Sequence, residues 1–245
     1  MTRTRGLLWL MLILPGLVWA ENAESEAPWY QFEVLVFQRI SAGAGSTEQW
    51  PVDPGVPSQE NAVYLSRGEA VVNNKAIPFK HLPAEEQELA DTWQTLRRSR
   101  DYRPLYLLAW RQPVSAPEQA EAVYFSLSSD DGSDLPKLEG RVRFGIKRYL
   151  HMDADILLRL PAVTEPARQD DLGYSPEHRL YRLQDSRRMR SGQTNYLDHP
   201  VLGVITLASR YEPPVIEPLP TPPQQNSAQP TAPQAVEPAP VPPAN

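Results

Sequence analysis

The residues best suited to bind a charged ligand are arginines gathered in two segments of the chain. In segment 141–149, basic and apolar residues largely alternate, so a strand would place Arg141, Arg143, Lys147 and Tyr149 on one face. A second basic group occupies positions 187–190. The planar guanidinium of arginine suits carboxylates, and neighbouring tyrosines offer flat apolar rings that stack on sugars. The predicted ligand-contacting residues are Arg141, Arg143, Arg187, Arg188, Arg190, Tyr196, Asp198 and His199.

Ion pairing within the chain is the alternative interpretation of these arginines. The chain has 30 acidic and 24 basic residues, so acidic partners are abundant. Surface pairs of this kind contribute little to stability and require no ligand. The two interpretations therefore differ in whether the basic side chains contact anything outside the chain.

Metal and catalytic motifs are not found in the sequence. His151, Asp153 and Asp155 would share one strand face, but their Cβ atoms would lie about 7 Å apart, which is too far for one metal to use all three easily. Asp198 and His199 with any serine supply the residue types of a hydrolase, without a nucleophile-elbow, zinc or phosphate-loop motif. We therefore expect a polar strand face at 151–155, no metal, no cofactor and no enzymatic activity.

The first twenty residues have the pattern of a secretory signal peptide. Arg3 and Arg5 precede an apolar run from Gly6 to Val18, and small residues at Val18 and Ala20 predict cleavage after Ala20. The apolar run is short for a membrane span, and a retained anchor is the alternative. We expect a mature protein that begins at Glu21 and resides in the periplasm.

Composition restricts the remaining possibilities. The chain has no cysteine, which excludes disulfides, thiol chemistry and an N-terminal lipid on cysteine. Its formal net charge is −6, and the loss of Arg3 and Arg5 makes the mature chain more acidic, which argues against nucleic acid as a partner.

The segment from Glu212 to Asn245 contains 12 prolines and no basic residue, so we expect a disordered, partly polyproline-II tail. A ligand for a proline-binding groove is the alternative for this tail.

The body of the chain, Glu21 to Tyr211, has the pattern of an α+β fold. We expect an antiparallel-rich sheet of about seven strands with one or two helices. The clearest helix signal covers Pro83 to Arg98, with acids early, arginines late and an apolar stripe between them. Trp50 lies in a polar loop, where it either covers the body or stacks on a ligand. The predicted strands are 29–37, 103–112, 122–127, 141–149, 151–158, 179–189 and 201–208.

Several segments, taken in their order along the chain, resemble the CsiV family of small periplasmic peptidoglycan-binding proteins. The longest is 186–204, Ser-Arg-Arg-Met-Arg-Ser-Gly-Gln-Thr-Asn-Tyr-Leu-Asp-His-Pro-Val-Leu-Gly-Val. The opening strand Trp29 to Phe37 agrees, as does Thr47-Glu-Gln-Trp-Pro51. Further matches in the same order are Tyr102 to Leu105, Ala109 to Pro113 and Arg148 to His151. The resemblance spans about Trp29 to Tyr211 and leaves out the proline-rich tail.

The resemblance implies a non-enzymatic role in cell-wall assembly. Family members bind peptidoglycan and are thought to act through an outer-membrane lipoprotein that activates a class A penicillin-binding protein. No residue-level binding site comes with the resemblance, so the ligand-contacting residues named above rest on the basic and aromatic clusters. A protein–protein adaptor without glycan contact is the alternative, and an exported hydrolase is a more distant one.

Overall fold

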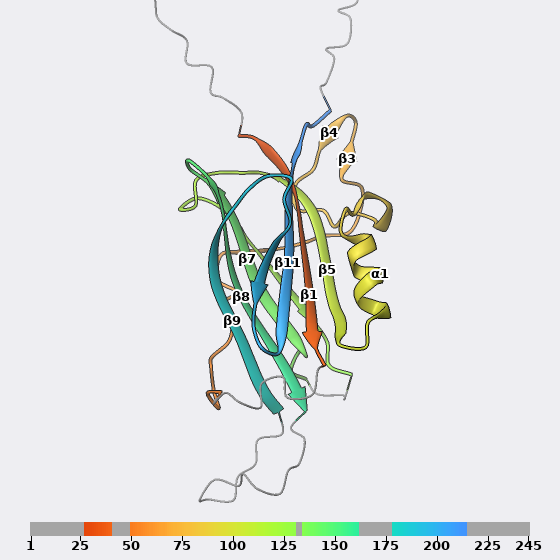
Figure 1. The fold of residues 1–245 in the computed structure, drawn as a ribbon. Coiled ribbons are helices and arrows are strands. Elements are labelled where there is room, and N and C mark those ends of the chain that lie inside the picture. Colours follow the sequence, from red (N-terminus) through yellow and green to blue (C-terminus); the bar gives the residue numbers. More distant parts are fainter. Residues whose placement is uncertain (1–26, 41–49, 131–133, 162–177, 215–245) are drawn as a thin grey trace, which may run out of the picture. The chain divides into compact units, whose positions relative to one another are not determined.

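The computed structural model describes residues 27–40, 50–130, 134–161 and 178–214. The predicted signal peptide, and all but the first residues of the predicted tail, lie outside these ranges. Within them the chain is strand-rich, with one α-helix, α1, and a short 3-10 helix before it (Figure 1). The strands are β1 (Trp29–Arg39), β2 (Ala62–Tyr64), β3 (Val71–Val72), β4 (Lys75–Ala76), β5 (Tyr102–Pro113), β6 (Ala122–Leu127), β7 (Leu138–Ile146), β8 (Leu150–Pro161), β9 (His178–Met189), β10 (Asn195–Asp198) and β11 (Leu202–Tyr211).

The first sheet has the strand order β10-β11-β1-β5 and is antiparallel throughout. Its central strand β1 pairs on both sides, with Trp29 opposite Tyr211 on β11 and opposite Pro113 on β5. The residues of β1 from position 30 to 37 are all buried, which explains why this segment is apolar almost without interruption. The predicted strand 29–37 is confirmed, and it lies inside the sheet rather than at its edge.

The second sheet has the order β2-β6-β7-β8-β9. Its pairs are antiparallel except for β2 and β6, which run parallel through a short contact. On β7 and β8 buried residues alternate with half-buried polar ones, as the sequence predicts. A separate two-stranded hairpin is formed by β3 and β4.

The main hydrophobic core lies between the two sheets. The rings of Phe32 on β1 and Phe144 on β7 stack with centroids 4.0 Å apart, and Trp110 on β5 packs against both of them. The structure differs here from the predicted seven-stranded sheet, because the strands divide into two sheets that face each other. Each sheet has an apolar face to bury, and packing the two faces together removes both from water.

The helix α1 (Ala90–Arg98) covers the other face of the first sheet beside β5 (Figure 1). Leu89, Trp93 and Leu96 pack against Leu35 and Phe37 of β1, so the predicted apolar stripe is confirmed. Arg97 and Arg98 lie in the last turn, where they complement the helix dipole.

The helix is shorter than the predicted Pro83 to Arg98. Residues Ala84–Glu86 form only a 3-10 turn, and α1 begins at Ala90. The cause is Glu33 on β1, whose side chain is fully buried. Its carboxylate accepts the backbone N–H groups of Glu88 at 2.7 Å and Leu89 at 2.8 Å. This contact from another element satisfies the amides that start α1 and fixes where the helix begins.

Candidate functional site

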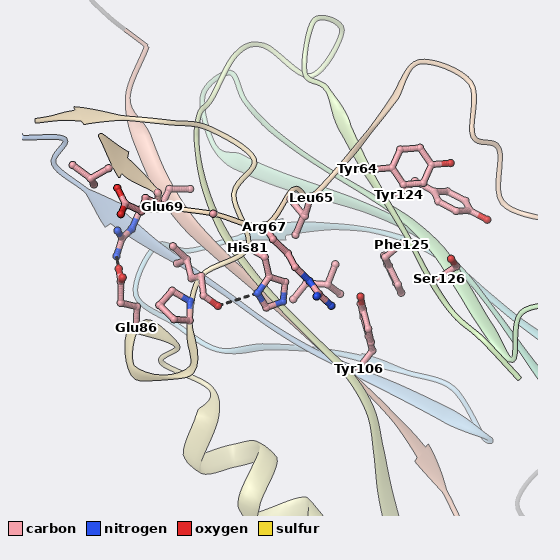
Figure 2. Close-up of a pocket in the computed structure, with 17 residues that line it drawn as sticks. Tyr64, Leu65, Arg67, Glu69, His81, Glu86, Tyr106, Tyr124, Phe125 and Ser126 are labelled. Carbon is pink, nitrogen blue, oxygen red and sulfur yellow. Dashed lines mark hydrogen bonds and ion pairs between the residues drawn. The ribbon is translucent and has the colours of Figure 1, made fainter. Parts of the chain in front are cut away.

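A cleft opens between β5, at the edge of the first sheet, and β6, in the second sheet. It has a volume of about 880 Å³. Tyr106 and Leu108 of β5 line one side, and Tyr124, Phe125 and Ser126 of β6 line the other (Figure 2). Residues 64–71 and 81–83 complete the wall. We call this feature the inter-sheet cleft.

Four aromatic rings give the inter-sheet cleft its apolar surface. Tyr106 and Phe125 stack across the gap between the sheets, with centroids 5.7 Å apart and planes 11° apart. Tyr64 lies 5.5 Å from Tyr124, and 55% of the Tyr64 surface is exposed. The exposed ring of Tyr64 and the half-buried ring of Tyr106 offer flat apolar surface to a ligand.

The Tyr124 hydroxyl is tied to a buried ion pair behind the cleft. It donates a hydrogen bond to the Glu139 carboxylate, which in turn pairs with the Arg159 guanidinium. Burial, together with the neighbouring carboxylate of Glu139, raises the pKa of Tyr124 to about 12. Tyr124 is therefore a fixed, neutral part of the wall rather than a titrating group.

The two arginines of the inter-sheet cleft have different surroundings. Arg111 is fully engaged: it pairs with Glu86 at 2.7 Å, donates to Gln31 at 3.0 Å and lies over the Tyr211 ring. Arg67 is exposed and points into the cleft from the loop after β2 (Figure 2). Within the described residues the Arg67 guanidinium forms no hydrogen bond, ion pair or ring contact. The cleft thus carries one cation that is free for a ligand.

The predicted residues Arg141 and Arg143 lie elsewhere, on the outer face of the second sheet. Arg143 is paired with Asp153 of β8 at 2.6 Å. Arg141 stands opposite Asp155, but that carboxylate is held by Arg182 at 2.7 Å. The Nε atom of Arg141 is buried without a hydrogen-bond partner in the described part of the chain. Internal pairing accounts for Arg143 but not for Arg141.

The three arginines at 187–190 do not form one cluster. Arg188 lies on the outer face, with its guanidinium 3.4 Å from the centre of the Tyr149 ring. Arg187 points to the opposite side of β9 and donates to the backbone carbonyl of Tyr196. Arg190 follows the end of β9 and is exposed. The alternation of side chains along a strand separates Arg187 from Arg188.

Tyr196 and Asp198 belong to an edge cluster around Arg39. The Arg39 guanidinium lies 2.6 Å from both the Tyr196 hydroxyl and the Asp198 carboxylate, and the Tyr196 hydroxyl donates to Asp198 at 2.9 Å. Arg39 could not be predicted as a member of this cluster, because its partners lie about 160 residues away along the chain, on β10. These contacts satisfy Tyr196 and Asp198 within the chain.

His199, one of the residues predicted to contact a ligand, is only 8% exposed. Its Nδ1 atom accepts the backbone N–H groups of Val201 and Leu202 at 3.2 and 3.4 Å. The Trp50 ring lies 4.7 Å from the imidazole and 5.5 Å from the Tyr181 ring, so Trp50 covers the body as one of the two interpretations expected. Burial lowers the pKa of His199 to about 4, which keeps the ring neutral at neutral pH.

The histidine and aspartates at 151–155 share one face of β8, as predicted. Asp153 accepts hydrogen bonds from Arg143 and Ser186, and these hold the pKa of its carboxyl below the usual range against the opposing effect of burial. A search of the described ranges finds no group of three or more ligating side chains placed to hold a metal. In the same ranges no helix is long and apolar enough to cross a membrane.

The residues of the inter-sheet cleft were missed in the sequence analysis. Tyr64, Arg67, Tyr106 and Tyr124 come from four segments that meet only after the two sheets pack. No spacing rule connects them. The sequence offers only two hints of the cleft, Tyr106 and Tyr124, each inside an apolar predicted strand. A tyrosine in such a position indicates a strand residue packed in the core and does not by itself indicate a binding site.

Comparison with known proteins identifies the family. A search of curated proteins and a search of solved structures each found no match. A family model described as "Peptidoglycan-binding protein, CsiV" matches residues 6–208, which include every strand but the last residues of β11. The resemblance inferred from the sequence is thus confirmed, and this chain belongs to the CsiV family of peptidoglycan-binding proteins.

Proposed function

We propose that this chain is a non-enzymatic, periplasmic peptidoglycan-binding protein that supports cell-wall assembly. The observation that carries the proposal is the inter-sheet cleft, where tyrosines and Arg67, which has no partner in the described ranges, surround an open apolar surface. Peptidoglycan combines sugar rings with peptides that bear carboxylates. Tyrosine rings suit the first component and a free guanidinium suits the second. The family description supports the same ligand.

The signal-peptide pattern supports the proposed location. Export followed by cleavage after Ala20 would bring the mature chain to the compartment that contains peptidoglycan. Mass spectrometry of the periplasmic fraction tests this step, and a chain that begins at Glu21 is the expected product. A membrane-bound product that retains Met1 would contradict it.

Sedimentation with purified sacculi tests peptidoglycan binding directly. The mature chain, residues 21–245, is expected in the pellet with sacculi and in the supernatant without them. Tyr64→Ala removes an exposed ring from the rim of the inter-sheet cleft, so it should weaken retention while the melting temperature stays unchanged. Thr92→Ala on α1, away from the cleft, is the matched control. A wild-type chain that stays in the supernatant at low salt would refute the proposed function.

The proposed cellular partner is an outer-membrane lipoprotein that activates a class A penicillin-binding protein. Chemical crosslinking in cells, followed by identification of the crosslinked protein, tests this part. Capture of the lipoprotein activator would support the proposal. A chain that captures the activator but never sediments with sacculi would instead be a protein–protein adaptor.

A further inference from the structure

The inter-sheet cleft has two chemically different ends. At one end the charge of Arg111 is balanced by Glu86, and Glu69 adds a further carboxylate to the wall (Figure 2). Arg67, a cation with no partner among the described residues, lies between this acidic end and the side chains of β5 and β6 (Figure 2). A ligand that places a carboxylate beside Arg67 gains a charge-assisted hydrogen bond, while one that places it beside Glu69 meets like charge.

The surface around Arg67 and toward β5 and β6 is largely apolar. Leu65, Leu108 and Phe125 contribute aliphatic and aromatic contacts, and Tyr106 closes the surface from the β5 side. Ser126 is exposed at the β6 side and offers a hydroxyl to a ligand amide. Short aliphatic side chains joined by amide groups match this mixture of apolar surface and isolated hydrogen-bonding groups.

The size of the cleft also restricts the ligand. A volume of about 880 Å³ falls within the range of roughly 300–1,000 Å³ that is usual for small-molecule sites. It accommodates a short peptide or a few sugars, and not a long strand of polymer. Recognition here is therefore local, directed at one repeating unit of the cell wall.

We propose that the inter-sheet cleft recognises the stem peptide of peptidoglycan, with Arg67 pairing with a free carboxylate of that peptide. This inference rests on the proposed function and specifies which part of the polymer the site contacts. Leu65 and Phe125 cover the aliphatic side chains of the peptide, and Tyr64 and Tyr106 flank its backbone. A neutral sugar chain leaves Arg67 without a partner, so it is the weaker ligand.

Titration calorimetry with three soluble probes tests the proposal on the mature chain. The probes are a free stem tetrapeptide, the same peptide with its carboxylates amidated, and a neutral oligomer of N-acetylglucosamine. The tetrapeptide is expected to bind most tightly. Loss of one charge-assisted contact weakens binding roughly ten- to a hundredfold, so the amidated peptide should bind weaker by about that factor.

Variants at position 67 identify the cation. Arg67→Ala should weaken tetrapeptide binding by the same factor and make the acid and amidated peptides equivalent. Arg67→Lys should restore part of the affinity, because it keeps the charge but loses the planar fork. Arg100→Ala removes an exposed arginine just after α1, outside the cleft, and should bind as wild type does. Arg67 is exposed, so circular dichroism melts of all three variants should match that of wild type.

Two results would overturn the inference, and neither is the result that refutes the proposed function. One is equal affinity of the wild-type chain for the acid and amidated peptides. The other is unchanged tetrapeptide binding by Arg67→Ala in a chain that melts normally. If either occurs while sacculi still retain the wild-type chain, peptidoglycan binding stands and the stem-peptide assignment fails. Loss of sacculus binding by wild type would refute both.

Discussion

The stability of this protein should fall below pH 6.5 because of one residue, His199. Burial lowers the pKa of this imidazole from the ordinary value of 6.5 to about 4 in the folded chain. Between these two values the unfolded chain binds a proton that the folded chain excludes. Stability therefore rises with pH in this window. The contribution is complete above pH 6.5 and is lost as the pH falls toward 4.

The size of the effect follows from the two pKa values. Protonation of the unfolded chain at pH 5 reduces the free energy of unfolding by about 2 kcal/mol relative to pH 7.5. A small domain has a total stability of roughly 5–15 kcal/mol, so this loss is readily measured. The structural reason is that imidazolium would lose the Nδ1 acceptor for Val201 and Leu202, and would be charged between Trp50 and Tyr181.

Urea denaturation at pH 7.5 and pH 5.0 tests this prediction. His199→Asn keeps a side-chain acceptor but has no ionisable group, so its pH-dependent loss should be smaller than that of wild type by about 2 kcal/mol. The comparison uses the change between the two pH values, so any constant cost of the substitution cancels. His151→Asn on the outer face of β8 is the matched control and should behave as wild type does. The reasoning is refuted if wild type and His199→Asn lose the same stability, or if NMR titration places the pKa of His199 near 6.5.

Three further predictions concern the fold and the second basic surface. Glu33→Ala leaves the N–H groups that start α1 without their buried acceptor, so chemical denaturation should show a loss of about 2–4 kcal/mol, and an unchanged midpoint would contradict this role. Gly140→Ala brings a Cβ atom to within 2.4 Å of the Phe125 ring, which must then move. We therefore expect the free energy of unfolding to fall by about 1–3 kcal/mol and tetrapeptide binding to weaken as well. If neither quantity changes, this prediction is wrong. The double variant Arg188→Ala/Arg190→Ala should melt as wild type does, because both side chains are exposed. Sedimentation then decides between the sites: sacculus binding by this variant is expected to persist if the inter-sheet cleft is the main site, and its loss would favour the basic outer face.

Local patterns in the sequence predicted the strands well. Alternation in 141–149 and 151–158 predicted two adjacent strands, which correspond to β7 and β8, because side chains along a strand point to opposite faces by geometry alone. The prediction is wrong for residues 147–149, since β7 ends at Ile146 and the chain turns there into β8. The aromatic and β-branched residues of 29–37 likewise indicated a strand, and the structure buries both of its faces. The short strands β2, β3, β4 and β10 were not predicted, since so few residues carry no readable period and form strands only when a neighbour is present.

The helix shows how a distant residue overrides a local signal. The sequence from Pro83 onward favours one continuous helix, with a proline in the first turn and acids following it. The buried Glu33 carboxylate instead captures the amides of Glu88 and Leu89 and moves the start of α1 to Ala90. Propensity acts over a few residues, whereas this contact joins positions 55 apart.

The sequence by itself determined the family of this protein, the identity of most strands and the abundance of arginine on polar strand faces. Only the tertiary structure decided which arginines are available. Arg143 is neutralised by Asp153, whereas Arg67 has no partner among the residues that the structure describes and lies beside a set of tyrosines. The physical reason is that pairing and burial depend on which segments meet. The inter-sheet cleft exists only because two sheets pack face to face and diverge between β5 and β6.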